Sequence, residues 1–512
     1  MRVIKGEEFY GAGYKNLLPQ NRFHRLFNKA MRKTKIVATL GPATEKALAI
    51  RKLISSGVDV FRLNLSHGSL SWHEERVKII RTASKEADKP VSIILDLQGP
   101  RIRTGLLKDG KPINLKSGDI VTITTKQVYG TEVIITTPYT SLPKDVKKGD
   151  RILLDDGRME LRVLGSSGTD IKCKVITGGL LKEHKGMNLP GVNLSVPSLT
   201  AKDKKNLSQG LTWGIDYVAI SFVRSAKDVK AVKDYIKRRG FSLPVIAKIE
   251  KPEAVEDMDN ILDEAEGVMV ARGDLGVEME PQSVPLIQKD IISRANKNGR
   301  LVITATQMLE SMISNPRPTR AEASDVANAM LDGTDAVMLS GETSVGQYPA
   351  EAVEMMSKIA SEAEKGLVVS DVRRRRANSG VTAQRQQYGT SAPFTYAVAY
   401  AALEAAIETD ARAIVIYTIF GRAAQLVSKL KPKCKVFALT PENTVYFKLP
   451  LLWGVEPVLV PFGDTTDRML DTGERVLIEK RLLNKGDVVV IVTGAPGIMG
   501  ATNMMKVHRI GE

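Results

Sequence analysis

A lysine and two acidic residues lie at the ends of two consecutive β-like runs in this sequence of 512 residues. Lys248 and Glu250 are two positions apart, so on a strand their side chains share one face. Asp274 ends the next run, within the glycine-containing stretch Ala271–Gly276. Two carboxylates at neighbouring strand ends can share Mg²⁺ or Mn²⁺, which keeps coordination positions for substrate and water. Lys248 beside this metal would face a phosphoryl group, whereas the same triplet taken alone is an ordinary solvated strand end.

Arg62 and Arg103 are the candidates for direct phosphate contact. Each lies on a segment at the end of a predicted strand, and guanidinium groups bind phosphate oxygens in bidentate fashion. A more familiar phosphate motif is rejected. Gly105–Lys111 almost fits a phosphate-binding loop, but Pro112 replaces the hydroxyl residue and a strand follows instead of a helix.

The elements that must position these residues are short apolar runs that alternate with helical patterns such as Ser71–Ala87, Ser225–Arg239 and Ser283–Asn298. Eight such strands with crossover helices predict an α/β fold, a (β/α)8 TIM barrel. The runs are Lys35–Leu40, Val58–Leu63, Val91–Leu95, Tyr217–Phe222, Val245–Ile249, Gly267–Val270, Leu301–Thr304 and Asp335–Leu339.

Polar residues follow seven of the eight runs, and this is the strongest sign of a site. In a barrel of this kind the C-terminal strand ends form the active-site face, so these residues are expected to converge on one pocket. They are Thr39–Gly41, Asn64–His67, Asp96–Gly99, Lys248–Glu250, Arg272–Asp274, Thr306–Gln307 and Ser340–Glu342.

About 120 residues separate the third run from the fourth, which is too many for one crossover helix. Their β-rich pattern, with turns such as Gly149-Asp150, predicts a small β-barrel inserted at the functional face, where it could act as a lid. We expect the barrel to comprise residues 31–100 and 199–372, and the inserted lid domain residues 101–198.

A separate C-terminal unit is predicted for residues 390–512, an open α/β sheet that follows a basic and polar linker, 373–389, containing Arg373–Arg376. Its loops Thr418–Gln425 and Thr493–Gly500 could hold an anionic allosteric effector, or they could be plain tight turns. Residues 1–30 form an N-terminal extension to which the sequence assigns no role.

The composition is that of a globular protein, with 43% hydrophobic residues and a formal charge of +16. We interpret the charge as a scattered basic surface that attracts anionic metabolites rather than a nucleic-acid site, because no stacking aromatics accompany the one dense basic run. No apolar stretch is long enough to suggest membrane insertion. Two distant cysteines, Cys173 and Cys434, favour a reducing, cytoplasmic setting.

Taken together, the motifs resemble those of pyruvate kinase from about Lys33 to Ile510. The resemblance implies a glycolytic phosphotransferase that uses phosphoenolpyruvate and ADP, with a barrel, a mobile lid and a regulatory domain assembled as a homotetramer. The stretches that carry it are Thr34–Pro42, Arg62–Gly68, Lys185–Gly191, Lys248–Glu250, Ala271–Gly276, Ala305–Met312, Pro316–Ala327 and Leu339–Thr343.

The resemblance also implies roles for single residues. Glu250 and Asp274 match the divalent-metal ligands, Lys248 the lysine that stabilises the transferring phosphoryl group, and Arg62 a phosphate contact. Thr306, with the backbone of Gly273 and Asp274, matches the substrate-carboxylate site and lies near the enolate protonation step. The nucleotide-side positions are Asn64, His67, Arg103, Lys202 and the lid residue Asp156.

One departure from the family concerns K⁺. Many members bind it with the residues that match Asn64, Ser66, Asp96 and the carbonyl of Leu97, and they carry a glutamate where this chain has Arg101. A guanidinium there supplies the charge that K⁺ would provide and removes the acidic residue that balanced it. We therefore predict that K⁺ is dispensable.

A second departure concerns the effector. Members that bind fructose 1,6-bisphosphate have a hydroxyl-rich loop ending in Ser-Gly-Arg-Thr, whereas Thr418–Ala423 reads Thr-Ile-Phe-Gly-Arg-Ala. Apolar residues replace the donors, so this bisphosphate is not the expected ligand. A sugar monophosphate, a nucleotide or no effector at all stays open.

Two other functions stay open at this point. A Mg²⁺-dependent barrel lyase or aldolase acting on an enolate would also carry carboxylates at strand ends, but it would need neither the β-rich insert nor nucleotide-side basic residues. A nucleic-acid-binding protein with a decayed site is disfavoured because Lys248, Glu250, Asp274 and Thr306 are all present.

Overall fold

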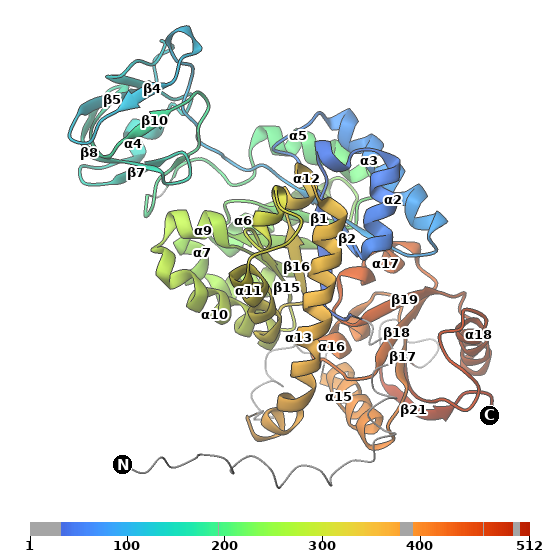
Figure 1. Ribbon diagram of the computed structural model, residues 1–512. Coiled ribbons are helices and arrows are strands. Elements are labelled where there is room, and N and C mark those ends of the chain that lie inside the picture. The colour runs from blue at the N-terminus through green and yellow to red at the C-terminus, as the bar shows by residue number, and fades with distance from the viewer. Residues whose placement is uncertain (1–31, 193, 379–392, 464, 495–501) are drawn as a thin grey trace, which may run out of the picture.

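The computed structural model describes residues 32–192, 194–378, 393–463, 465–494 and 502–512, which form three parts (Figure 1). The predicted N-terminal extension, residues 1–30, lies outside these ranges. A closed parallel barrel occupies the centre, a β-rich insert lies at one end of it, and an α/β unit lies at the other. The predicted fold class is thus confirmed.

The barrel closes in the order β1-β16-β15-β14-β13-β12-β3-β2, and all its pairings are parallel. Each of the eight predicted runs contributes one strand. The strands are β1 (Lys35–Thr39), β2 (Val60–Asn64), β3 (Ser92–Asp96), β12 (Tyr217–Ile220), β13 (Val245–Ile249), β14 (Gly267–Ala271), β15 (Leu301–Ala305) and β16 (Ala336–Leu339).

Helices surround the barrel, and the three helical patterns singled out in the sequence correspond to α3, α6 and α10. Ser225 caps α6 in a reciprocal capping box with Asp228, which satisfies backbone donors at the helix start. The helices are α2 (Ala47–Ser56), α3 (Leu70–Glu86), α5 (Ala201–Gly210), α6 (Ala226–Arg238), α7 (Pro252–Glu256), α8 (Met258–Glu264), α9 (Arg272–Glu278), α10 (Val284–Lys297), α11 (Arg320–Leu331), α12 (Gly341–Ser344) and α13 (Pro349–Asn378).

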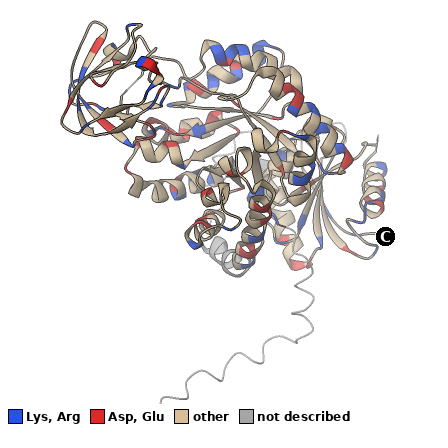
Figure 2. Ribbon diagram, turned by 45° about the horizontal axis from the view of Figure 1, so that its top comes forward, with Lys and Arg blue, Asp and Glu red and all other residues tan. Residues whose placement is uncertain are grey.

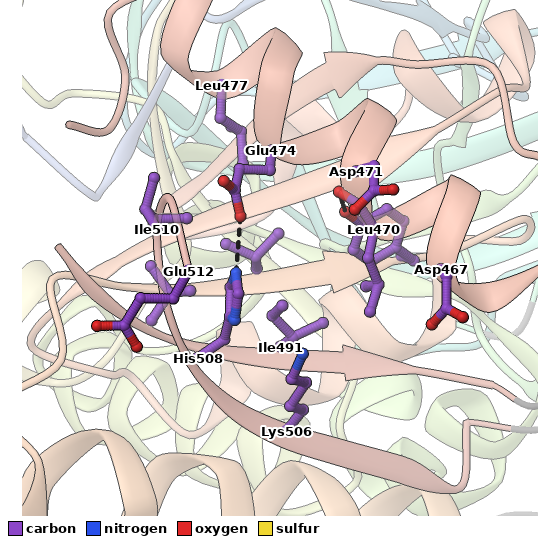
Figure 3. Close-up of a pocket in the computed structure, with 13 residues that line it drawn as sticks. Asp467, Leu470, Asp471, Glu474, Leu477, Ile491, Lys506, His508, Ile510 and Glu512 are labelled. Carbon is purple, nitrogen blue, oxygen red and sulfur yellow. Dashed lines mark hydrogen bonds and ion pairs between the residues drawn. The ribbon is translucent and has the colours of Figure 1, made fainter. Parts of the chain in front are cut away.

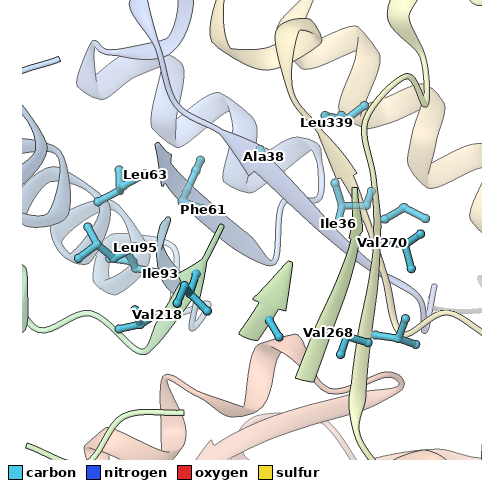
Figure 4. Close-up of a cluster of buried hydrophobic side chains, with 14 of the residues drawn as sticks. Ile36, Ala38, Phe61, Leu63, Ile93, Leu95, Val218, Val268, Val270 and Leu339 are labelled. Carbon is cyan, nitrogen blue, oxygen red and sulfur yellow. The ribbon is translucent and has the colours of Figure 1, made fainter. Parts of the chain in front are cut away.

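Alternate residues of each strand enter two different hydrophobic clusters. Ile36, Phe61 and Val268 belong to the cluster between strands and helices (Figure 4), whereas Val37 and Val60 belong to the cluster inside the barrel. This alternation follows from the period of two in a strand. It decides which strand-end side chains point into the barrel.

At the N-terminal end of the barrel, an acidic residue precedes every second strand and accepts the backbone N–H of the strand before it. Buried N–H groups at strand starts need such partners. The pairs are Asp59 with Ile36 N at 2.9 Å, Asp216 with Ile93 N at 2.7 Å, Glu266 with Val245 N at 2.8 Å and Asp335 with Val302 N at 2.9 Å.

The insert lies between β3 and β12 and consists of a six-stranded sheet and a two-stranded ladder around a core of its own. The β-rich sequence pattern predicts strands at 119–125, 132–137, 151–154, 160–164 and 170–176, and each corresponds to one strand of the insert. The short strands β4, β10 and β11 were not predicted. Its elements are β4 (Ile113–Leu115), β5 (Ile120–Thr124), β6 (Ile134–Thr136), α4 (Leu142–Asp145), β7 (Arg151–Leu154), β8 (Met159–Ser167), β9 (Asp170–Thr177), β10 (Gly179–Leu181) and β11 (Met187–Asn188).

The C-terminal sheet has the order β19-β18-β17-β20-β21, with α15 and α16 packed on one face and α18 on the other. Its last strand, β21, is antiparallel and was not predicted. The elements are α15 (Pro393–Glu408), β17 (Ala413–Tyr417), α16 (Arg422–Lys429), β18 (Lys435–Thr440), α17 (Asn443–Tyr446), β19 (Val455–Leu459), α18 (Thr466–Glu479), β20 (Val488–Thr493) and β21 (Met504–Arg509).

This unit contacts the N-terminal end of the barrel. Lys429 and Lys431 both pair with the buried carboxylate of Asp335, and the Tyr217 hydroxyl donates to the carbonyl of Lys448 over 2.9 Å. The contacts lie opposite the strand ends that carry the candidate catalytic residues.

The predicted linker 373–389 differs from the structure at its start. Helix α13 continues to Asn378, so it includes Arg373–Arg376. Arginine and alanine favour helix, and no glycine or proline lies between Leu367 and Asn378. The rest of the predicted linker, from 379 on, lies outside the described residues.

Among the residues that the structure describes, no helix is both long enough and apolar enough to span a membrane. Figure 2 shows Lys and Arg on all three parts of the molecule, with Asp and Glu among them. This distribution agrees with a scattered basic surface.

Candidate active site

Four consecutive barrel strands place the central side chains of the site. Val60, Ile94, Ala219 and Ile246 all belong to the cluster inside the barrel. The residue two positions further along each strand must face the same interior. These residues are Arg62 on β2, Asp96 on β3, Ser221 after β12 and Lys248 on β13.

Asp96 lies between the two cationic groups. Its Oδ2 is 2.6 Å from the Arg62 guanidinium and 3.6 Å from Nζ of Lys248. Arg62 also donates to the hydroxyl of Thr39 over 3.1 Å. All three charged side chains are almost fully buried. Two positive charges are thus held close together at the C-terminal face of the barrel, where an anionic group could bind them.

Ser221 is part of this cluster, and the sequence analysis missed it. Nζ of Lys248 donates to its Oγ over 2.7 Å, and the Ser221 hydroxyl donates to the carbonyl of Leu97 over 2.9 Å. A signal was available, because Ser221 is a polar residue next to the end of the fourth predicted run, and polar residues mark the ends of the other seven.

Glu250 is the better buried of the two predicted metal ligands. Its Oε1 lies 2.8 Å from Nζ of Lys248, and its Oε2 accepts the N–H of Phe222 over 2.8 Å. The net effect of the surroundings is to raise the pKa of Glu250: burial raises it most, the positive charge of Lys248 lowers it, and the nearby Asp274 carboxylate raises it further. For Lys248, burial lowers the pKa, but Asp96 and Glu250 outweigh it, so the net direction is upward and the lysine stays charged.

The two carboxylates fit a hard divalent cation. The Asp274 carboxylate is near enough to Glu250 to raise its pKa, and carboxylate oxygens are the ligands that Mg²⁺ prefers. Within the described residues, no group of three or more His, Cys, Asp or Glu side chains is gathered for a metal ion.

Thr306 and Gly273 are held together as the third predicted part of the site. The N–H of Gly273 donates to the Thr306 hydroxyl over 2.8 Å, and this hydroxyl donates to the carbonyl of Ala305 over 2.6 Å. Asp274 lies in the first turn of α9, next to Gly273. Thr306 and Gln307 both have positive φ angles, 66° and 53°, although neither is glycine.

The residues predicted for the nucleotide side include His67, Arg103 and Lys202. His67 is close enough to three arginines that burial together with Arg101, Arg103 and Arg62 lowers its pKa. Arg103 donates to the carbonyl of His184 over 3.1 Å. Lys202 donates to Oε1 of Gln98 over 2.8 Å. The three arginines around His67 make this region attractive to phosphate groups.

Of the oxygens that match the monovalent-cation pocket, some have hydrogen-bond partners within the described part of the protein and one has none. Oδ1 of Asn64 accepts the N–H of Ser66 over 3.1 Å, and the carbonyl of Leu97 is taken by Ser221. Oδ1 of Asp96 is buried and has no hydrogen-bond partner. The Arg101 guanidinium lies 4.0 Å from Oδ1 of Asp156 in the insert.

The predicted effector loops lie in the C-terminal unit. The Thr418 hydroxyl accepts the N–H of Gly421, which has a φ of 81° and precedes α16. Most of the second loop, residues 495–500, lies outside the described residues. A cavity of about 200 Å³ lies elsewhere, between α18 and the β20–β21 hairpin (Figure 3). Its four carboxylates outnumber Lys506 and His508, so it does not suit an anionic effector.

Comparisons with known proteins agree along the chain. The family model described as "Pyruvate kinase, barrel domain" matches residues 31–353, and "Pyruvate kinase, alpha/beta domain" matches residues 396–508. The chain is 46% identical over 481 residues to pyruvate kinase 2 of Synechocystis, covering 93% of this chain and 79% of that protein. It is 44% identical to pyruvate kinase of Corynebacterium glutamicum over 94% of this chain and 98% of that one. A crystal structure of a pyruvate kinase from Cryptosporidium parvum superposes with a TM-score of 0.86 at 36% identity, covering 96% and 98% of the two chains.

Proposed function

The chain belongs to the pyruvate kinase family, and we propose that Arg62, Lys248, Glu250 and Asp274 form the centre at which it transfers a phosphoryl group from phosphoenolpyruvate to ADP. The products are pyruvate and ATP. The observation that carries the assignment of the site is the meeting of Arg62 and Lys248 at one carboxylate oxygen of Asp96, next to Glu250. An enolate lyase would not need ADP, so the nucleotide requirement separates the two reactions.

Phosphoryl transfer depends mainly on positioning and on neutralising the charge that develops on the phosphoryl oxygens. Arg62 binds phosphate oxygens through its planar guanidinium, and Lys248 stabilises the group as it moves. Asp96 holds both cations at fixed distances, so little reorganisation is needed when the substrate binds. Burial strengthens these interactions because the local dielectric constant is low.

Glu250 and Asp274 would hold Mg²⁺ or Mn²⁺, and this ion, when bound, supplies charge neutralisation to the phosphoryl oxygens. Lys248 next to Glu250 keeps that carboxylate oriented.

The second half of the reaction is protonation of enolpyruvate at carbon. We assign the substrate carboxylate to the backbone of Gly273 and Asp274, and the proton-transfer position to Thr306 together with a water. The hydrogen bond from Gly273 N to Thr306 Oγ1 supports this assignment, because it brings the carboxylate site and the hydroxyl to one place.

ADP would bind where the insert faces the barrel, at His67, Arg103 and Lys202, with Asn64 and the insert residue Asp156 nearby. The nearness of Arg101 and Arg103, at the start of the insert, to His67 on the barrel supports this position, since it joins the two parts that would close on the nucleotide. Closure of the insert would exclude water and suppress hydrolysis of the phosphoryl donor.

Activity without K⁺ is part of the proposal. Arg101 adds a positive charge beside His67 and Arg103, where K⁺-dependent relatives are expected to carry a glutamate. Oδ1 of Asp96 has no hydrogen-bond partner among the described residues, so it is the oxygen that a bound K⁺ would contact. The response of the enzyme to K⁺ therefore tests this part of the proposal. We also propose that the protein is a cytoplasmic homotetramer and that the Thr418–Gln425 loop binds an anionic effector. Both proposals rest on the resemblance to the family.

The test is pyruvate formation from phosphoenolpyruvate, ADP and Mg²⁺ in tetramethylammonium buffer, followed by addition of KCl. Similar rates in both buffers would support both the pyruvate kinase activity and its independence of K⁺. A rate that rises many-fold with KCl would keep the function and refute the role of Arg101. No pyruvate under either condition would refute the proposed function, provided that the protein is folded.

A further inference from the structure

The side chain of Arg272 donates hydrogen bonds to the loop that carries Thr306. Its Nη2 donates to the carbonyls of Thr306 and Gln307 over 2.8 and 2.9 Å, and its Nε donates to the same Thr306 carbonyl over 3.2 Å. The side chain is 10% exposed. One buried guanidinium therefore holds two consecutive carbonyl groups at the edge of the active site.

These carbonyls belong to residues in an uncommon backbone conformation. Thr306 has a φ of 66° and Gln307 a φ of 53°. Left-handed conformations are unfavourable for side chains other than glycine, and two in succession persist only where surrounding contacts enforce them. The forked guanidinium of Arg272 supplies such contacts, because two of its nitrogens reach both carbonyls at once.

Other helices fix the guanidinium itself. Nη1 lies 2.6 Å from Oδ2 of Asp325 on α11 and 3.5 Å from Oε1 of Gln288 on α10. Every nitrogen of the guanidinium is thus engaged with the loop or with these helices. Arg272 therefore has no donor left over for a substrate phosphate.

The backbone next to Arg272 completes the link. Gly273, the following residue, donates its N–H to the Thr306 hydroxyl over 2.8 Å. The start of α9 therefore grips Thr306 twice, through the Arg272 side chain at its carbonyl and through Gly273 at its hydroxyl. The orientation of this hydroxyl relative to the Gly273–Asp274 backbone depends on both contacts.

We propose that Arg272 is a positioning residue that sets the Thr306 hydroxyl for proton transfer, with Asp325 orienting Arg272. This inference rests on the role proposed above for Thr306. It assigns to Arg272 no contact with the substrate and no part in the phosphoryl-transfer half of the reaction.

The test is a double-mutant cycle between Arg272→Lys and Thr306→Ala. Lysine keeps the positive charge but cannot hold two carbonyls in a fork. The readout is exchange of the pyruvate methyl protons with D₂O, followed by NMR in the presence of Mg²⁺ and ATP. We expect Arg272→Lys to slow exchange by about 10- to 100-fold, with the KM for phosphoenolpyruvate within about threefold of wild type.

The double variant decides between positioning and general stabilisation. If Arg272 acts through Thr306, then Arg272→Lys added to Thr306→Ala costs no further rate. Multiplied losses, or exchange at the wild-type rate in Arg272→Lys, would overturn the inference. Arg294→Lys is the matched control, because Arg294 pairs with Asp259 at 2.8 Å on the outside of the barrel.

A second variant covers failure of Arg272→Lys to fold. Asp325→Asn removes the charge that orients the guanidinium at a side chain that is 40% exposed, and we expect exchange to slow by about three- to tenfold. An unchanged exchange rate in this variant would then overturn the inference. If the wild-type protein forms pyruvate but the losses of the two single variants multiply in the double variant, only the role of Arg272 is refuted. If the wild-type protein forms no pyruvate, the proposed function is refuted.

Discussion

The Arg62 guanidinium lies 2.6 Å from Oδ2 of Asp96, and it contacts that oxygen through both Nε and Nη2. The same oxygen is 3.6 Å from Nζ of Lys248. One buried carboxylate thus offsets the repulsion between two cations that would otherwise separate. The arrangement keeps both charges in place before an anionic substrate arrives, which is what phosphoryl transfer requires of its site.

Removal of the Lys248 charge should impair the chemical step. We expect Lys248→Met to lower kcat by about 10³-fold, because a charge aimed at the transferring group acts mainly in the transition state. Steady-state kinetics with phosphoenolpyruvate and ADP would measure this. Lys429→Met is the matched control, since Lys429 is also a buried lysine paired with a carboxylate, but it lies at the opposite end of the barrel. A wild-type kcat in Lys248→Met would contradict the assignment.

Ser221 should matter for the same reason, although less. Ser221→Ala removes the hydroxyl that accepts from Lys248 and donates to Leu97. We expect kcat to fall by about tenfold, the equivalent of one well-placed hydrogen bond. The control is Ser208→Ala, whose hydroxyl bonds to the carbonyl of Lys204 on the outer helix α5. Equal kinetics for the two variants would show that Ser221 does not orient Lys248.

Arg101 should decide the response to K⁺. We expect the wild-type rate to change less than about threefold when KCl is added, and the rate of Arg101→Glu to rise at least tenfold, because a carboxylate there would need a cation as partner. Initial rates in tetramethylammonium buffer with and without KCl measure both. Arg158→Glu controls for the change of charge, since Arg158 belongs to the insert and is 81% exposed. A K⁺-independent Arg101→Glu variant would refute the proposed role.

Asp59 should stabilise the barrel in a pH-dependent way. Burial alone would raise its pKa, but Arg32, Lys89 and Lys35 lower it to about 2. The folded-state pKa is below the ordinary value, so the stabilisation is present above pH 4 and is lost as the pH falls toward 2. It corresponds to about 2 kcal/mol at neutral pH.

We therefore expect Asp59→Asn to reduce the free energy of unfolding by about 2 kcal/mol at pH 7, with the difference from wild type shrinking as the pH falls below 4. Urea unfolding at several pH values would measure this. Asp88→Asn is the control, because Asp88 pairs with Lys480 at a side chain that is 77% exposed. A pH-independent difference would mean that Asp59 acts through its hydrogen bond to Ile36 and not through its charge.

Much of the fold was predictable because its signals are local. The period of two in apolar runs identified all eight barrel strands, and the polar residues after them identified the active-site face. The predictions missed strands that are only two or three residues long and one strand that depends on pairing with another segment of the chain. The strands β4, β10 and β11 have two or three residues each, and β21 is an antiparallel edge strand that depends on pairing with β20.

The amino-acid sequence by itself determined that Lys248 and Glu250 share one face of one strand, and that Asp274 follows the next strand. Both relations are set by strand geometry over a few residues. Only the tertiary structure decided that Asp96 lies between Arg62 and Lys248, that Ser221 joins them, and that Arg101 turns toward Asp156. These contacts depend on the order and stagger of strands in a closed barrel and on where the insert lies. Such distances between residues far apart in the chain are set by packing, which no local pattern encodes.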